Sequence, residues 1–287
     1  MDHSAFDTLL RAHVVDGRVD YDAFQAAREF PEYLARLARV EPDSLPESER
    51  LAFWINVYNA YTIALVNAHG ERESIRNINK TAGLRLKGPW REELVHVGSR
   101  RYHLDNVEHD IIRKQFAEPR IHFALVCAAT SCPPLRSEAY VGTRLDAQLD
   151  DQARRFLLET PDQNRVDVAA RVVHVSRIFE YYEEDFGGSD AAIGRYIAQF
   201  HPAGAARDLL LSGNFHVVKT AYDWSLNIRR HARERTDVCR LGQKRPRARS
   251  LAGRISRQVV HQPVRIVSVN SGGRPSASIS RASSAWS

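Results

Sequence analysis

Apolar residues recur every three to four positions along most of the first 230 residues, which predicts a mostly helical fold. One face of the first predicted helix carries Phe6, Leu9 and Leu10. The same spacing predicts further helices over residues 34–40, 50–69, 106–116, 144–158, 178–186 and 193–200. The helix over residues 50–69 is the most apolar segment of the chain, so we expect it to lie in the core.

Alternation of apolar and polar residues predicts short strands between these helices. Two hairpins are expected over residues 95–104 and 166–175, and a last strand over residues 215–218. The apolar run at 121–126 is also predicted to be a strand, followed by a turn, because two prolines soon after it suit the first turn of a new element. The predicted fold class is α+β: a single, mostly helical domain with short antiparallel strands and hairpins.

Composition places the chain among globular proteins. It has 287 residues, of which 43% are hydrophobic and 26% charged. No apolar run approaches the ~20 residues of a membrane-spanning helix, so no membrane partner is expected. Residues 1–24 contain acidic residues and lack a basic start followed by an apolar stretch, so no secretory signal is predicted. We therefore expect a cytoplasmic location, with cysteines that are reduced rather than bridged.

Charge divides the chain into two parts. Residues 231–287 hold 12 Lys and Arg against two Asp and Glu, which leaves 29 basic and 33 acidic residues for 1–230. Pro, Ser and Gly are frequent in this basic tail, so we predict one domain over 1–230 and a disordered tail over 231–287. Nothing in the domain favours a nucleic-acid partner. A weak contact of KRPRAR at 244–249 with nucleic acid or an acidic surface stays open.

The most reactive side chains gather in one segment, RIHFALVCAATSCPPLRSEAY at 120–140. It contains His122, Cys127 and Cys132, and the chain has only three cysteines. Thiols and imidazoles are the side chains most easily turned into nucleophiles, bases or metal ligands near neutral pH. The segment therefore indicates where a functional site lies, more clearly than which reaction it performs.

A cysteine nucleophile is the leading hypothesis. It predicts a thiol-dependent hydrolase or acyl transferase that acts on an unidentified small molecule or peptide. Cys132 precedes two prolines, and a helix N-terminus at that point would favour its thiolate. The candidate catalytic residues are two thiols as nucleophiles, two imidazoles as bases, and a carboxylate and two amides as orienting groups: Cys132, Cys127, His109, His122, Glu108, Asn56 and Asn59.

Two other chemistries use the same residues. The two cysteines and two histidines could bind zinc, although a strand would turn His122 and Cys127 to opposite faces. The two cysteines could also exchange electrons as a disulfide, although their spacing is not that of the C-x-x-C motif. The chain has no glycine-rich phosphate loop, so no nucleotide cofactor is expected and no cofactor is assigned.

Purely structural interpretations stand beside these. A cysteine on an apolar strand is often a small core residue, and the chain would then be a non-enzymatic binding or scaffold domain. Asn56 and Asn59 lie on one face of the core helix, where their amides would brace neighbouring backbone. The acidic run Glu183, Glu184 and Asp185 is interpreted as a solvated face.

Four motifs together resemble a known family. They are FWINVYNAYTIALV at 53–66, DNVEHDIIR at 105–113, the segment at 120–140 and YDWSLN at 222–227. The chain is similar over residues 5–229 to the bacterial and plant family of domain of unknown function number 547. The resemblance marks as family features Asn56, Asn59, Glu108, His109, His122, Cys127, Cys132 and Pro133. No activity is settled for that family, and its bacterial members often carry export signals, which this sequence does not show.

Overall fold

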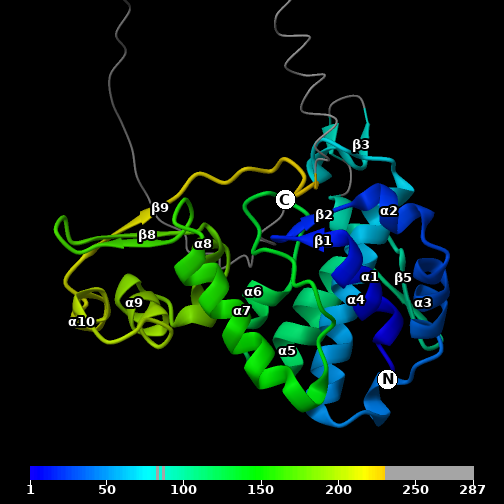
Figure 1. Ribbon diagram of the computed structural model, residues 1–287, viewed down its shortest axis with the longest axis horizontal. Helices are drawn as coiled ribbons and strands as arrows, with labels where there is room; N and C mark the ends of the chain where they lie inside the picture. Colours follow the sequence, from blue (N-terminus) through cyan, green and yellow to red (C-terminus); the bar gives the residue numbers. More distant parts are fainter. Residues whose placement is uncertain (82–83, 86–87, 230–287) are drawn as a thin grey trace, which may run out of the picture. The chain divides into compact units, whose positions relative to one another are not determined.

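The computed structural model describes residues 1–81, 84–85 and 88–229 of the chain. These residues lie in one compact unit that extends from Met1 to Arg229 (Figure 1). The predicted basic tail lies outside the described residues.

Helices dominate the described part of the chain. The longer ones are α1 (Ser4–His13), α2 (Tyr21–Ala26), α3 (Glu29–Leu37), α4 (Glu47–Ala68), α7 (Leu145–Glu159), α9 (Asp190–Ala198) and α10 (Ala205–Ser212). Shorter ones are α5 (Arg113–Gln115), α6 (Ile121–Ala124), α8 (Ile178–Tyr181) and the π-helix η4 (Asn106–Ile112). Single 3₁₀ turns are η1 (Pro42–Ser44), η2 (Ile75–Asn77), η3 (Pro89–Arg91), η5 (Gly142–Arg144) and η6 (Glu183–Phe186).

The strands are short and form small sheets. Three antiparallel hairpins pair β1 (Val14–Val15) with β2 (Arg18–Val19), β3 (Lys80–Thr81) with β4 (Leu84–Arg85), and β5 (Val95–Val97) with β6 (Arg100–Tyr102). A fourth sheet has the order β7 (Arg165–Asp167), β8 (Val172–Val175), β9 (His216–Lys219). The pair β8 and β9 is parallel, whereas only antiparallel pairs were predicted. The α+β class with a mostly helical domain is confirmed.

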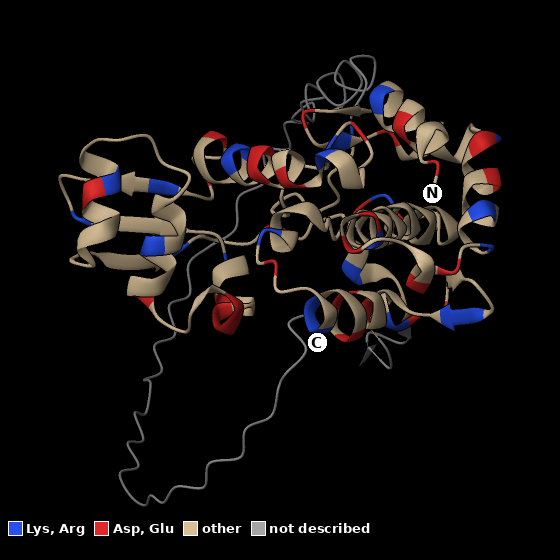
Figure 2. Cartoon of the chain, turned by 90° about the horizontal axis from the view of Figure 1, so that it is seen from below, with Lys and Arg blue, Asp and Glu red and all other residues tan. Residues whose placement is uncertain are grey.

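Helix α4 forms the centre of the core. Every residue from Leu51 to Ile63 is buried, because the helix is apolar on all sides and contacts α2, α3, α7 and η4 (Figure 1). Acidic residues occupy its first turn, where the helix dipole favours them. Helices α1, α3 and α7 carry both acidic and basic residues, whereas η6 has only acidic charges and β6 only basic ones (Figure 2).

The cysteine segment is not the strand that its apolar run predicted. Residues 121–124 form the one-turn helix α6, and an irregular loop continues to residue 141. A short buried apolar run fits a strand and a buried helix equally well. Side-chain amides replace the sheet partners here: Gln152 of α7 donates to the carbonyls of Phe123 (3.0 Å) and Pro134 (2.7 Å). No helix begins at the two prolines, so Cys132 does not lie at a helix N-terminus.

Candidate functional site

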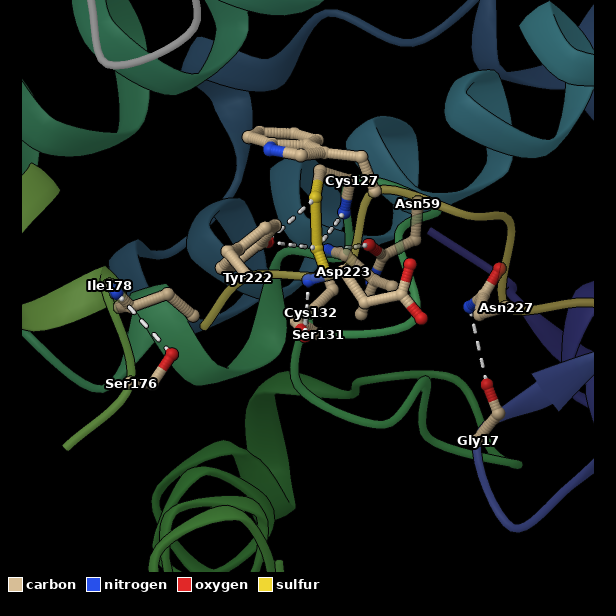
Figure 3. Close-up of a disulfide and its surroundings, with 12 residues drawn as sticks. Gly17, Asn59, Cys127, Ser131, Cys132, Ser176, Ile178, Tyr222, Asp223 and Asn227 are labelled. Carbon is tan, nitrogen blue, oxygen red and sulfur yellow. Dashed lines mark hydrogen bonds between the residues drawn. A yellow bond between two sulfur atoms is a disulfide. The ribbon is translucent and has the colours of Figure 1, made fainter. Parts of the chain in front are cut away.

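The two cysteines of the segment are joined by a disulfide (Figure 3). The expectation of reduced cysteines is therefore wrong for this structure. Cys132 Sγ accepts a hydrogen bond from the backbone N–H of Cys127 (3.0 Å). The hydroxyl of Tyr222 lies 3.3 Å from Cys132 Sγ and 3.4 Å from Cys127 Sγ, so it donates to the bridged pair.

Two amides of α4 hold the backbone on either side of the disulfide. The Asn59 side chain donates to the carbonyl of Ala124 (2.9 Å) and accepts from the N–H of Val126 (2.9 Å). Asn56 makes the same pair of bonds with Tyr140, at 2.7 Å to its carbonyl and 3.0 Å from its N–H. The interpretation that these asparagines brace neighbouring backbone is confirmed. Among the residues that the structure describes, neither amide forms a hydrogen bond with an imidazole.

A C-terminal strap, residues 221–229, fastens the loop from the other side. The N–H of Thr130 donates to the carbonyl of Ser225 (2.7 Å), and the N–H of Asn227 donates to that of Ala128 (3.0 Å). Ala128, between the cysteines, has a φ of 65°, which residues with a Cβ rarely adopt. The strap thus holds an unfavourable backbone conformation and brings Tyr222 against the sulfurs (Figure 3).

A cleft of about 440 Å³ opens beside Cys132. Four segments line it: residues 16–18 at the β1–β2 turn, 130–134 of the loop, 159–163 at and beyond the end of α7, and Ala221, Asp223 and Asn227 of the strap. Cys127 is not among the lining residues. Gly17 has a φ of 75°, and a Cβ there would lie 2.4 Å from Cβ of Pro134, so this wall requires glycine.

His122 lies in a buried polar network rather than beside the sulfurs. Its side chain is 1% exposed, and its Nε2 lies 2.6 Å from Asp185 Oδ2. The ring stacks on Tyr182, with 3.8 Å between the ring centroids. Burial lowers the pKa of His122, although the neighbouring Asp185 carboxylate opposes the shift. We therefore assign a neutral imidazole whose Nε2–H donates to Asp185.

Asp185 connects this network to the surface. Arg113 donates two hydrogen bonds to its carboxylate, from Nε (2.7 Å) and Nη2 (2.9 Å). Burial opposes ionisation of Asp185, but the hydrogen bonds from His122 and Arg113 outweigh it and lower the pKa of the carboxyl. The interpretation of Asp185 as part of a solvated acidic face is wrong, whereas Glu183 and Glu184 are exposed as expected.

Glu108 and His109 lie in the same network. Buried Glu108, in the π-helix η4, accepts a hydrogen bond from the hydroxyl of Tyr182. Arg113 Nη1 donates to His109 Nδ1 at 3.0 Å. We define the buried polar network by its members: Glu108, His109, Arg113, His122, Tyr182 and Asp185.

The predicted catalytic residues therefore separate into two groups. Within residues 1–81, 84–85 and 88–229, the hydrogen-bond partners of the sulfurs are Cys127 N–H and Tyr222, and neither histidine contacts a sulfur. The cysteine–histidine pair expected for a hydrolase is not formed. Among these residues no cluster of three or more His, Cys, Asp or Glu could hold a metal ion, so the four proposed zinc ligands are not gathered.

Four residues of these groups were not predicted: Arg113, Tyr182, Asp185 and Tyr222. Tyr222 belongs to the YDWSLN motif, and that motif was the available signal for it. Its distance from the cysteines along the chain, 95 residues from Cys127, hid the contact.

The fold and the site thus define the protein as a mostly helical domain with a disulfide beside a polar cleft. Residues 42–157 match the family described as protein of unknown function, DUF547, and the chain contains a domain of this family. The match spans α4 to most of α7 and includes every predicted catalytic residue, but not Tyr182, Asp185 or the strap. No curated protein and no solved structure matches the chain. In the described residues no helix is long and apolar enough to cross a membrane.

Proposed function

We propose that this domain carries out thiol–disulfide exchange, with Cys127 and Cys132 as the redox pair and Cys132 as the sulfur that meets the substrate. The observation that carries the proposal is the position of the disulfide: Cys132 lines the cleft and Cys127 does not. An exchange reaction requires one sulfur that an external thiol or disulfide reaches and a second that resolves the mixed disulfide.

Two donors support this assignment of roles. After reduction, the N–H of Cys127 and the hydroxyl of Tyr222 are within reach of Cys132 Sγ. Hydrogen bonds to a charged acceptor are stronger than those to a neutral one, so both donors favour the thiolate, which is the attacking species.

The exchange balances in atoms and electrons. The Cys132 thiolate attacks one sulfur of a substrate RSSR, which forms a mixed disulfide and releases RS⁻. The Cys127 thiolate then attacks Cys132 Sγ, which re-forms the bridge and releases the second RS⁻. Two electrons pass from the protein to the substrate. Two external thiolates reverse the sequence and reduce the bridge.

The thiol-dependent hydrolase or acyl transferase predicted from the sequence has less support. It would use reduced Cys132 as the nucleophile, but both candidate bases, His109 and His122, lie in the buried polar network. The Tyr222 hydroxyl lies within 3.4 Å of both sulfurs, but burial raises its pKa well above the ordinary value, which disfavours its anion and so its use as a base.

The test uses the full chain with Cys239→Ser, so that the third thiol does not react. The reduced protein is mixed with bis(2-hydroxyethyl) disulfide, and released thiol and protein mass are followed. Cys132→Ser should reduce release to the uncatalysed level, whereas Cys127→Ser should accumulate a mixed disulfide on Cys132. Unchanged release from Cys132→Ser would contradict the proposal. A burst of p-nitrophenol from p-nitrophenyl acetate with the reduced protein alone, without disulfide exchange, would favour the acyl-transfer alternative.

A further inference from the structure

The charges that line the cleft indicate which disulfides it accepts. We infer that the exchange partner is a small, positively charged thiol or disulfide that carries an ammonium group. This inference rests on the proposed exchange function and adds a substrate class to it.

The cleft wall has an excess of negative charge. Four carboxylates line it against one guanidinium, that of Arg18. The carboxylates are Asp16, Glu159, Asp162 and Asp223. They come from the β1–β2 turn, from the end of α7 and the residues that follow it, and from the strap, so three separate parts of the chain bring acidic residues to one cavity. The carboxylates therefore converge on the cleft beside Cys132 and are not a run of charge along one helix.

These charges are not neutralised by neighbours. Within the described ranges, none of the four carboxylates forms an ion pair with Lys, Arg or His. Elsewhere a comparable carboxylate is surrounded: Glu138 pairs with Arg11, Arg136 and Arg144. Arg18 donates to Thr130 Oγ1 at 3.1 Å and to none of the carboxylates. The negative field is therefore available to a ligand in the cleft.

The oxygen atoms of the cleft suit a ligand that donates hydrogen bonds. Gln163 lines the cleft, and its Oε1 is buried and accepts no hydrogen bond from the described residues. An ammonium group has donors and no acceptor, so it complements a wall that carries four carboxylates. An anionic ligand would meet the same oxygens as repulsive neighbours.

Size and access favour a small molecule. A cavity of about 440 Å³ lies within the range of small-molecule sites. Cys132 is only 5% exposed, so a bulky protein disulfide would not reach its sulfur without rearrangement. A small molecule with a disulfide and an ammonium group a few bonds away fits both the limited exposure of Cys132 and the four carboxylates that line the cleft.

A clustered field of one sign raises the local concentration of opposite charge and the association rate by about tenfold or more at low salt. We therefore expect the rate of exchange to follow the order cystamine, bis(2-hydroxyethyl) disulfide, 3,3′-dithiodipropionate. The cationic and anionic probes should differ by at least about tenfold at low ionic strength, and the difference should shrink as salt is added.

The test measures the three rates with the full chain carrying Cys239→Ser, each divided by the rate for the same protein unfolded in urea to remove intrinsic reactivity. The double variant Glu159→Gln/Asp162→Asn should lower the cationic preference several-fold. The matched control, Glu183→Gln/Glu184→Gln, removes two exposed charges that do not line the cleft and should leave the preference unchanged.

The outcomes separate the two proposals. Equal normalised rates for the three probes, or a preference that the cleft variant does not reduce, would overturn the inference while exchange with the neutral probe upholds the proposed function. Absence of exchange with all three probes would overturn the proposed function itself.

Discussion

His122 and Cys132 lie ten residues apart in one segment, yet their surroundings are opposite. His122 belongs to helix α6, is almost fully enclosed and is held by Asp185 and Tyr182. Cys132 belongs to the irregular loop, lines a polar cleft and contacts Tyr222. A histidine and a cysteine that are close in sequence thus belong to different parts of the molecule.

The separation has a local cause. Helix α6 ends at Ala124. The Asn59 side chain there donates a hydrogen bond to the carbonyl of Ala124 and accepts one from the N–H of Val126. These are backbone groups that a sheet would otherwise pair. The chain then continues as a loop that the strap holds, so the segment turns from the interior toward the cleft within a few residues. Proximity in sequence therefore does not establish a catalytic pair, because a single change of backbone conformation separates the side chains.

The largest expected difference is between a substitution of Cys132 and a substitution of His122. Cys132→Ser should abolish disulfide exchange, whereas His122→Gln should leave the exchange rate within about twofold when the protein is folded, because His122 contacts neither sulfur. Exchange with bis(2-hydroxyethyl) disulfide measures both. A His122→Gln protein that remains folded and loses disulfide exchange would show that the buried polar network contributes to the reaction at Cys132.

The next largest effect is expected from removing the Asn59 amide, which holds the backbone between His122 and Cys132. Asn59→Leu leaves one buried carbonyl and one buried N–H without a partner, and each costs about 1–3 kcal/mol. We expect the free energy of unfolding to fall by about 2–5 kcal/mol in urea denaturation. The control is Asn67→Leu on the same helix, whose half-buried amide donates to the Tyr21 carbonyl and accepts from the Arg72 guanidinium, a group that water can reach instead. Equal losses in the two variants would refute the bracing role.

A smaller effect is expected at the sulfurs. Tyr222→Phe removes a hydroxyl that lies within 3.4 Å of both, and one lost hydrogen bond corresponds to roughly a three- to tenfold slower exchange. Tyr196→Phe is the matched control, because the Tyr196 hydroxyl has no hydrogen-bond partner among the described residues. A Tyr222→Phe rate equal to that of the control would remove Tyr222 from the exchange site.

The smallest expected effect is on the pH dependence of the free energy of unfolding. Burial lowers the pKa of His122, so the unfolded imidazole takes up a proton at higher pH than the folded one. The stability that neutral His122 contributes is present above about pH 6.5 and is lost as the pH falls below that value. Asp185, whose pKa is also lowered, adds a further loss as the pH falls below about 4.

His122→Gln keeps a donor for Asp185 and removes the titration. We therefore expect its unfolding free energy to fall less steeply than that of the wild type between pH 6.5 and 5, as followed by urea denaturation at each pH. Parallel curves would contradict the assignment of a buried neutral imidazole.

Sequence patterns predicted the regular part of the fold. Helices α4 and α7 and the hairpins β5–β6 and β7–β8 follow from apolar periodicity, because a long amphipathic or wholly apolar pattern has few alternatives. The same patterns did not predict α10 or the parallel pair β8–β9, since neither the helix nor the partner of a strand was evident from local spacing.

The segment that lies beside the cleft was evident from the sequence, but its contacts were not, and its function stays a prediction. The segment around Cys127 and Cys132 is the one that lies beside the cleft, as the density of thiols and imidazoles indicated. The roles of Tyr222 and Asp185 depend on contacts across long stretches of chain, which periodicity does not encode. The two cysteines form a disulfide because the fold brings their sulfurs together. The sequence analysis predicted reduced cysteines because it assumed a reducing compartment.

The most direct test is the rate at which dithiothreitol reduces the Cys127–Cys132 bridge in the folded protein, compared with the rate of global unfolding in the same buffer. Peptide mass spectrometry follows the bridge, and near-ultraviolet circular dichroism follows the fold. We predict reduction that is faster than unfolding, proportional to dithiothreitol concentration and accompanied by retained tertiary structure. Reduction that occurs only at the unfolding rate, independent of dithiothreitol concentration, would show a structural bridge and contradict an exchange site at Cys132.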